Sequence, residues 1–167
     1  MNKLLRFTVP FLLAGIAGLA LAADKDKEEA KGDKLEFKVQ SGYFEKNNSG
    51  LKGDESLLAF TDQKSFDQVF GVGFTMGKKP DVLPKDAFDS KLVVAVIRRG
   101  DAPSTYKVDK VTADGDTLYL QYDATSKKGD GSAKFASPLI VSVDKGKYKT
   151  VVFLENGKKV GTADVPK

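Results

Sequence analysis

The chain has 167 residues, 41% of them hydrophobic and 30% charged, and it contains no cysteine, histidine or tryptophan. This length fits one ordinary domain better than two. Without cysteine there is no disulfide and no thiol nucleophile, and without histidine the usual general base and the usual transition-metal ligand are missing. These absences favour a non-enzymatic binding or structural module.

The first 22 residues have the pattern of an export signal. Lys3 and Arg6 give a basic start, residues 7–22 are predominantly apolar, and residues 20–22 form the small-x-small motif that signal peptidase recognises. A membrane anchor is the alternative, but it needs about 20 residues, and the apolar run is shorter and contains Pro10. We therefore expect cleavage after this motif and an extracytoplasmic protein, periplasmic or secreted, that no membrane segment retains.

The charge of the mature chain is mixed and dispersed. Residues 23–34 carry both charge signs and almost no apolar side chain, so we expect a flexible charged leader that cannot offset its ordering entropy. The whole chain has 27 basic and 23 acidic residues, and removal of Lys3 and Arg6 with the signal leaves a net charge of +2. A nucleic-acid partner is not expected, because its footprint would be a clustered basic patch.

Residues 35–165 are expected to form one domain that is mainly β. The run 91–97 is apolar at every position, which is typical of a central strand covered on both faces. Other strands are predicted from alternating apolar side chains bounded by turn residues. All the predicted strands together are 35–39, 56–60, 91–97, 106–111, 117–122, 139–143, 149–154 and 159–163.

One short helix interrupts this pattern over about residues 62–70. Three apolar side chains, beginning with Phe66, follow the spacing of one helical face. Either Ser65 with Gln68, as a capping box, or Asp62, three residues earlier, can cap its start. The helix is expected to pack against the β layers.

Turn residues define the connections between the strands. Asp114-Gly115 and Asn156-Gly157 predict two-residue hairpin turns, and residues 144–146 predict a third hairpin, between strands 139–143 and 149–154. Bulges are expected near residues 109–110 and at Gly42. Seven or eight short strands with this spacing favour an antiparallel sandwich or a small open barrel with one helix.

Two acidic turns could suggest metal binding or catalysis. Asp114 and Asp116 are too close in one turn to face each other across a sugar at the ~5–9.5 Å that glycoside hydrolysis requires. Neither this pair nor Asp130 has the spacing of an EF-hand loop or the lysine of a P-loop. We predict no catalytic residue, no metal and no cofactor.

The strongest candidate for partner binding follows the central strand. Guanidinium groups and an aromatic ring in a loop held by rigid strands suit a protein or an anion. The alternative is structural, with Arg99 paired to Asp101 and Tyr106 packed in the core. The candidate partner-binding residues are Arg98, Arg99, Asp101, Pro103, Ser104, Thr105 and Tyr106.

Four sequence motifs lie in this region: LVVAVIRRG, the Pro-x-x-Tyr loop of GDAPSTYKV, the hairpin VDKVTADGDTLYLQY, and KKGDGSAKFASPLIVSV. With them, the segment Leu92–Val152 resembles the C-terminal domain of the protease-complex subunit PrcB family. That family usually has Gly-Gly-Tyr where this chain has Ser-Thr-Tyr, so Tyr106 alone is carried over. The resemblance implies an exported, non-catalytic domain of the kind associated with surface protease complexes.

We therefore expect an exported, non-catalytic protein-binding module, with a protease among its candidate partners. Two alternatives stay open. One is a structural or stress-related cell-envelope protein without a dedicated site. The other is a small-ligand carrier, which would need a concave pocket with converging polar groups. No pattern in the sequence sets an oligomeric state.

Expression of the full chain in a host with signal peptidase tests the export prediction. We expect an extracytoplasmic product of 145 residues that begins at Ala23, because removal of 22 residues from 167 leaves that number. Intact-mass analysis and N-terminal sequencing check it. Ala22→Arg should block cleavage, and a wild-type protein that keeps all 167 residues in the membrane fraction would contradict the prediction.

Overall fold

The computed structural model describes residues 30–73, 80–127 and 133–167. The expected export signal, residues 23–29 of the expected leader, and the turn at Asp130 lie outside these ranges. The elements are β1 (Asp33–Leu35), β2 (Phe37–Gln40), β3 (Tyr43–Glu45), β4 (Glu55–Phe60), α1 (Gln63–Val69), β5 (Phe70–Val72), α2 (Ala87–Ser90), β6 (Lys91–Gly100), β7 (Ser104–Asp114), β8 (Thr117–Ser126), β9 (Phe135–Asp144), β10 (Thr150–Glu155) and β11 (Lys158–Asp164).

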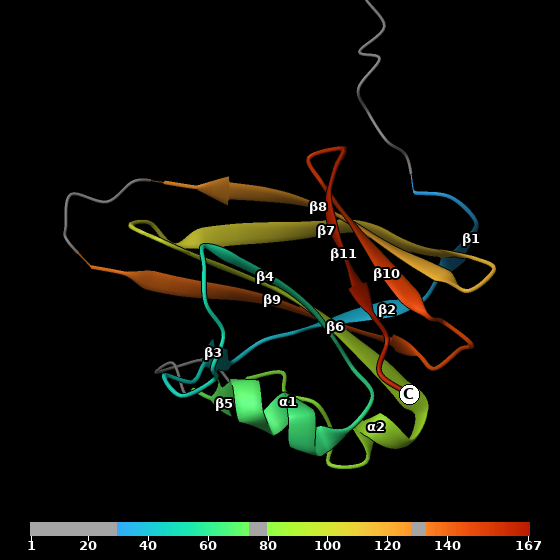
Figure 1. Cartoon of the computed structure of the whole chain (residues 1–167), viewed down its shortest axis with the longest axis horizontal. Helices are drawn as coiled ribbons and strands as arrows, with labels where there is room; N and C mark the ends of the chain where they lie inside the picture. Colours follow the sequence, from blue (N-terminus) through green and yellow to red (C-terminus); the bar gives the residue numbers. More distant parts are fainter. Residues whose placement is uncertain (1–29, 74–79, 128–132) are drawn as a thin grey trace, which may run out of the picture.

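The strands form two stacked sheets, and the helices cover the outer face of one of them (Figure 1). The five-stranded sheet has the order β1-β7-β8-β10-β11, and the four-stranded sheet has the order β2-β9-β6-β4. A small pair, β3-β5, lies beside α1. The expected mainly β fold is confirmed, as a sandwich rather than a closed barrel.

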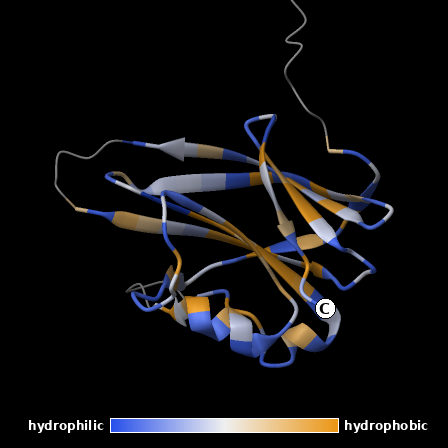
Figure 2. Ribbon diagram, viewed as in Figure 1, coloured by the Kyte–Doolittle hydropathy of each residue, from blue (hydrophilic) through white to orange (hydrophobic). Residues whose placement is uncertain are grey.

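Strand β6 lies at the centre of the fold because both of its faces are buried. Its side chains from Leu92 to Ile97 are each 2% exposed or less. Even-numbered residues such as Val94 face the five-stranded sheet, and odd-numbered residues such as Val93 face the helices. Figure 2 shows the hydrophobic positions gathered along β6 and the elements around it. The prediction of a central strand covered on both sides is confirmed.

The helical side of β6 is filled by aromatic rings. Phe66 of α1 packs edge-on against Phe60 and Tyr43, with ring centroids 5.4 and 5.2 Å apart. Asp62 caps the helix by accepting a hydrogen bond from the Ser65 amide at 2.9 Å. Of the two predicted caps, the structure therefore uses the earlier one.

The described residues contain more short elements than the sequence indicates, with eleven strands and two helices. The additional strands β1, β3 and β5 have three residues each, too few to show a period in side-chain polarity. Strand β1 begins at Asp33, inside the stretch expected to be a flexible leader, because its backbone pairs with residues 111–113 of β7. That boundary of the leader is corrected.

Two predicted turns and one predicted bulge are found in the described residues, and one of the turns is shifted. Asn156 and Gly157 both have positive φ between β10 and β11, as a tight hairpin requires. Asp114 pairs with Thr117, so the turn of the β7–β8 hairpin consists of Gly115 and Asp116, one residue later than predicted. The predicted bulge is confirmed by a register shift between Val108 and Lys110.

Two other predictions are wrong. Strands β9 and β10 do not form a hairpin across residues 144–146, because β9 lies between β2 and β6, whereas β10 pairs parallel to β8 in the other sheet. Gly42 is not a bulge: with φ +80° it lies where the chain leaves β2 for β3. A side chain there would place its Cβ 2.2 Å from the Cβ of Pro80.

In the ranges that the structure covers, no helix is both long and apolar enough to span a membrane. Both helices are short, and their buried residues face the protein core.

Truncation of side chains on the two faces of β6 tests its double burial. Leu92→Ala on the sandwich face and Ile97→Ala on the helical face should each lower the free energy of unfolding by about 2–5 kcal/mol, because each leaves a cavity. Chemical denaturation measures both. Val160→Ala is the control, since that side chain is 40% exposed and should cost little. A neutral effect at either β6 position would contradict this packing.

Candidate functional site

The two candidate arginines lie on opposite faces of β6. Successive residues of a strand point to opposite sides, so Arg98 reaches Glu155 on β10, whereas Arg99 reaches Glu45 on β3. The two guanidinium groups therefore form no common cationic patch, contrary to the expectation that both lie together in one loop. Each is already engaged within the protein.

Arg98 is held by two carboxylates at the end of the sandwich. Its Nη2 donates to both carboxylate oxygens of Glu155 at 2.6 Å, and Glu55 lies 3.5 Å away. The hydrogen bond to Glu155 raises the pKa of the arginine further. Because Glu155 is nearly buried, this pair ties β6 to β10.

Arg99 has a larger set of partners on the other face. Its Nε and Nη2 donate to the two oxygens of Glu45 at 2.8 and 2.7 Å, and Nη1 donates to the Gly53 carbonyl at 3.1 Å and to Ser56 Oγ at 3.0 Å. The predicted pairing with Asp101 is therefore wrong. Burial opposes the charge of Glu45, but hydrogen bonds from Arg99 and Ser49 outweigh it and lower the pKa of Glu45.

The loop after the arginines is shorter than expected. Gly100 still belongs to β6 and Ser104 already to β7, so the connection is only residues 101–103. Asp101 forms an ion pair with Lys134, and Pro103 is exposed.

Ser104 and Thr105 are strand residues, not loop residues. Their hydroxyl groups bond across the β7–β8 hairpin to Ser126 at 2.7 Å and to Thr125 at 2.8 Å, in register. Neither Ser104 nor Thr105 has the positive φ that favours glycine, because among the described non-glycine residues positive φ occurs only at Asn156.

Tyr106 joins the two sheets. Its hydroxyl donates to the Ser137 carbonyl of β9 at 2.9 Å, and its ring packs at 6.0 Å from the buried ring of Tyr122. The Ser104 amide donates to the Ser137 hydroxyl at 2.9 Å, beside this contact. Burial raises the pKa of Tyr106. The environment of Tyr106 therefore fits the structural alternative, in which this tyrosine packs in the core.

What stays accessible at this end is a rim around the paired arginines. Two open, contiguous hollows of about 510 and 390 Å³ lie there, between the start of β4, the end of β6 and the start of β9. The ring of Phe135 is 38% exposed beside them, directly across from Gly100. We call this surface the Phe135 rim; its residues are Asp54, Gly100, Asp101, Lys134 and Phe135.

Sequence reasoning missed the partners that fix the arginines and the residues of the rim. Glu45 is 54 positions from Arg99, and Glu155 is 57 positions from Arg98. No local pattern marks either glutamate, because strand pairing alone brings them close. Phe135 also lacks a signal, since an aromatic residue at the start of a strand is normally interior.

The described residues contain no cluster of three or more acidic side chains that could hold a metal ion. At the sandwich end Arg98, Arg99 and Asp101 are each held in an ion pair. Comparisons with protein-family models, with curated proteins and with solved structures found no match to this chain.

The Glu45–Arg99 pair makes stability depend on pH. Glu45→Gln should lower the free energy of unfolding at pH 7 by about 2–3 kcal/mol, because it leaves the guanidinium without its carboxylate. The folded-state pKa of Glu45 is below its ordinary value of 4.5, so the pair's contribution is complete above that pH and is lost as pH falls through the folded-state pKa.

Denaturation of both proteins between pH 7 and pH 3 checks this. The difference in free energy of unfolding between wild type and Glu45→Gln should shrink toward pH 3. Asp81→Asn is the control, because the Lys38–Asp81 pair is more than half exposed and should contribute under about 1 kcal/mol. A difference that is constant across the whole range would contradict the assigned role of Glu45.

Proposed function

We propose that the chain is an exported, non-catalytic β-rich module that binds another protein through the Phe135 rim. The observation that carries the proposal is an exposed aromatic ring fixed on a rigid strand end. Phe135 begins β9 and pairs in register with the end of β6, whose arginines are locked by ion pairs. Protein interfaces favour aromatic anchors that are surrounded by polar groups.

The rim adds Phe135 to the surface around the arginines. Arg98 and Arg99 line its larger hollow while held in their ion pairs, and the connection between β6 and β7 carries the exposed residues Asp101 and Pro103. Loops held by rigid strands are where binding residues concentrate. The resemblance of this region to the PrcB family supports a protease as the partner to test first.

A structural or stress-related envelope protein is the second candidate. It is favoured by the completeness of the internal ion pairs and by the scatter of exposed apolar side chains. Among the large apolar residues that the described structure exposes, only Phe135 lies on the rim; the others are Val39, Phe44, Val72 and Val160. An interface without a larger apolar patch depends strongly on this single ring.

Capture from the extracytoplasmic fraction of the native source tests the proposal. Wild-type protein should retain a partner, and Phe135→Ala should weaken the affinity measured with that purified partner at least tenfold. Val160→Ala is the matched control, because its side chain is 40% exposed against 38% for Phe135. Equal affinity of wild type and Phe135→Ala would reject the rim, and absence of any retained partner would favour the structural candidate.

A further inference from the structure

Gly100 differs from every other glycine that the structure describes. Six glycines have a positive φ, which side chains rarely tolerate. In four others, Gly71, Gly73, Gly146 and Gly161, an added Cβ would lie within 3.3 Å of a neighbouring side chain. Gly100 has neither a positive φ nor, among the described atoms, any neighbour within 4 Å of the position of a Cβ. Neither the backbone conformation nor the packing at this position therefore requires glycine.

Gly100 leaves the β6 backbone bare directly beside an exposed ring. It pairs in register with Phe135 of β9, and the side chains of such a pair lie on the same face of the sheet. The Phe135 ring is 38% exposed and does not cover the glycine, because none of its atoms lies within 4 Å of the Cβ position. Both residues line the smaller hollow of the rim, of about 390 Å³, and Gly100 lines the larger one too. We call the bare backbone and the adjacent ring the Gly100–Phe135 socket.

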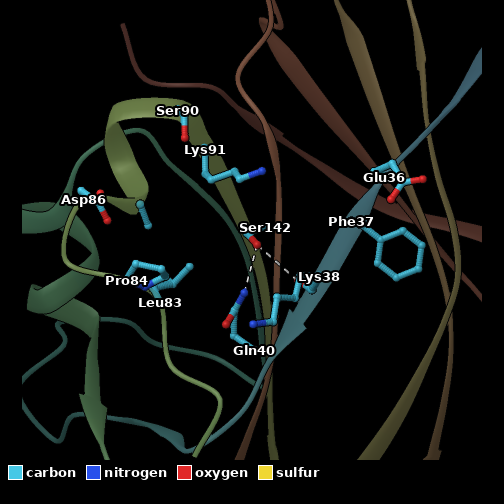
Figure 3. Close-up of a pocket in the computed structure, with 11 residues that line it drawn as sticks. Glu36, Phe37, Lys38, Gln40, Leu83, Pro84, Asp86, Ser90, Lys91 and Ser142 are labelled. Atoms are coloured by element: carbon cyan, nitrogen blue, oxygen red, sulfur yellow. Dashed lines mark hydrogen bonds between the residues drawn. The ribbon is translucent and has the colours of Figure 1, made fainter.

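The hollow beside α2 has no such arrangement, since none of its described lining residues is a glycine. It has a volume of about 350 Å³ and lies between β2, α2 and the start of β6 (Figure 3). Gln40 donates from Nε2 to Ser142 Oγ at 3.0 Å, and Lys38 and Lys91 are held in ion pairs by carboxylates that do not line the hollow. Its aromatic residue, Phe37, is partly buried against the sandwich core. A bare backbone beside an exposed ring therefore distinguishes the rim from this hollow.

A flat aromatic ring fits the socket better than a branched side chain or an anion does. Glycine within a strand often marks a place where a ligand or another chain approaches the backbone closely. A ring can lie on the bare backbone and contact Phe135 at the same time, and contacts between aromatic rings stabilise more than their buried area alone. The basic groups of the same hollow, Lys134 and Arg99, are already paired with Asp101 and Glu45, so an anion gains little there.

We propose that the Gly100–Phe135 socket receives an aromatic side chain of the partner protein. The ring lies across the β6 backbone at Gly100 and packs against Phe135, as aromatic anchors do in the pockets at the centre of protein interfaces. This inference rests on the proposed function, because it names the chemistry of the group that the Phe135 rim binds. Gly100 is then a specificity-determining residue, since a side chain at this position would occupy the space of the ring.

Three neutral amides that differ only in the side chain test the socket: N-acetylphenylalanine amide, N-acetylleucine amide and N-acetylglycine amide. Each is titrated into the folded protein, and binding is followed by the backbone amide chemical shifts of Gly100 and Phe135. The phenylalanine amide should bind at least fivefold more tightly than either other amide. No shifts with the phenylalanine amide up to about 20 mM, or a leucine or glycine amide that binds as tightly, would overturn the proposal.

Gly100→Val should fill the socket without harming the fold. It should weaken binding of the phenylalanine amide at least fivefold, yet melt no lower than wild type, because its side chain enters open space and valine favours strands. Thr162→Val is the matched control: it is an exposed position on β11, outside both hollows, and should bind as wild type does. Unchanged binding in Gly100→Val would overturn the proposal. A lower melting temperature would overturn it too, because the fold itself would then require the glycine.

Affinity for the purified partner separates this proposal from the proposed function. Phe135→Ala and Gly100→Val should both weaken that affinity, whereas Thr162→Val should not. If Phe135→Ala weakens it and Gly100→Val leaves it unchanged, the rim stands as a binding surface and the socket is rejected. If neither variant changes it, the proposed function is rejected together with the socket.

Discussion

The whole fold depends on strand β6, because both of its faces must be excluded from water. Residues Leu92–Ile97 offer apolar side chains in both directions, so a single sheet cannot satisfy them and two layers must cover them. The five-stranded sheet covers one face, and the aromatic cluster around Phe66 covers the other. The position of each remaining element follows from which face of β6 it covers.

The same alternation determines what happens where the strand leaves the core. At Arg98 and Arg99 the side chains still point to opposite layers, but they are now charged, and each needs a carboxylate from its own layer. Glu155 and Glu45 supply these, one from the five-stranded sheet and one from the small β3-β5 pair. The pairs therefore act as the last contacts of the two cores, and they hold the backbone that carries the rim.

Sequence patterns predicted the parts of this architecture that depend on neighbours along the chain. The apolar run of β6, the cap at Asp62 and the Asn156-Gly157 turn follow from side chains within a few positions of each other. Strand order does not have such a local origin. The parallel pairing of β8 with β10, and with it the place of Glu155, depends on which sheet can accept each strand, and the turn at residues 144–146 gives no information about that.

Polar side chains whose hydrogen bonds are made inside the protein support the fold and are less free to bind a partner. Arg99 uses Nε, Nη1 and Nη2 in hydrogen bonds, and Arg98 holds Glu155 through Nη2, so both guanidinium groups are engaged within the fold. Gln40 follows the same rule in the interior, because its Nε2 donates to Ser142 Oγ at 3.0 Å and so links β2 to β9. The sequence therefore directed attention to the residues with the strongest chemistry, whereas the structure shows that Arg98 and Arg99 are engaged in ion pairs with glutamates more than 50 positions away.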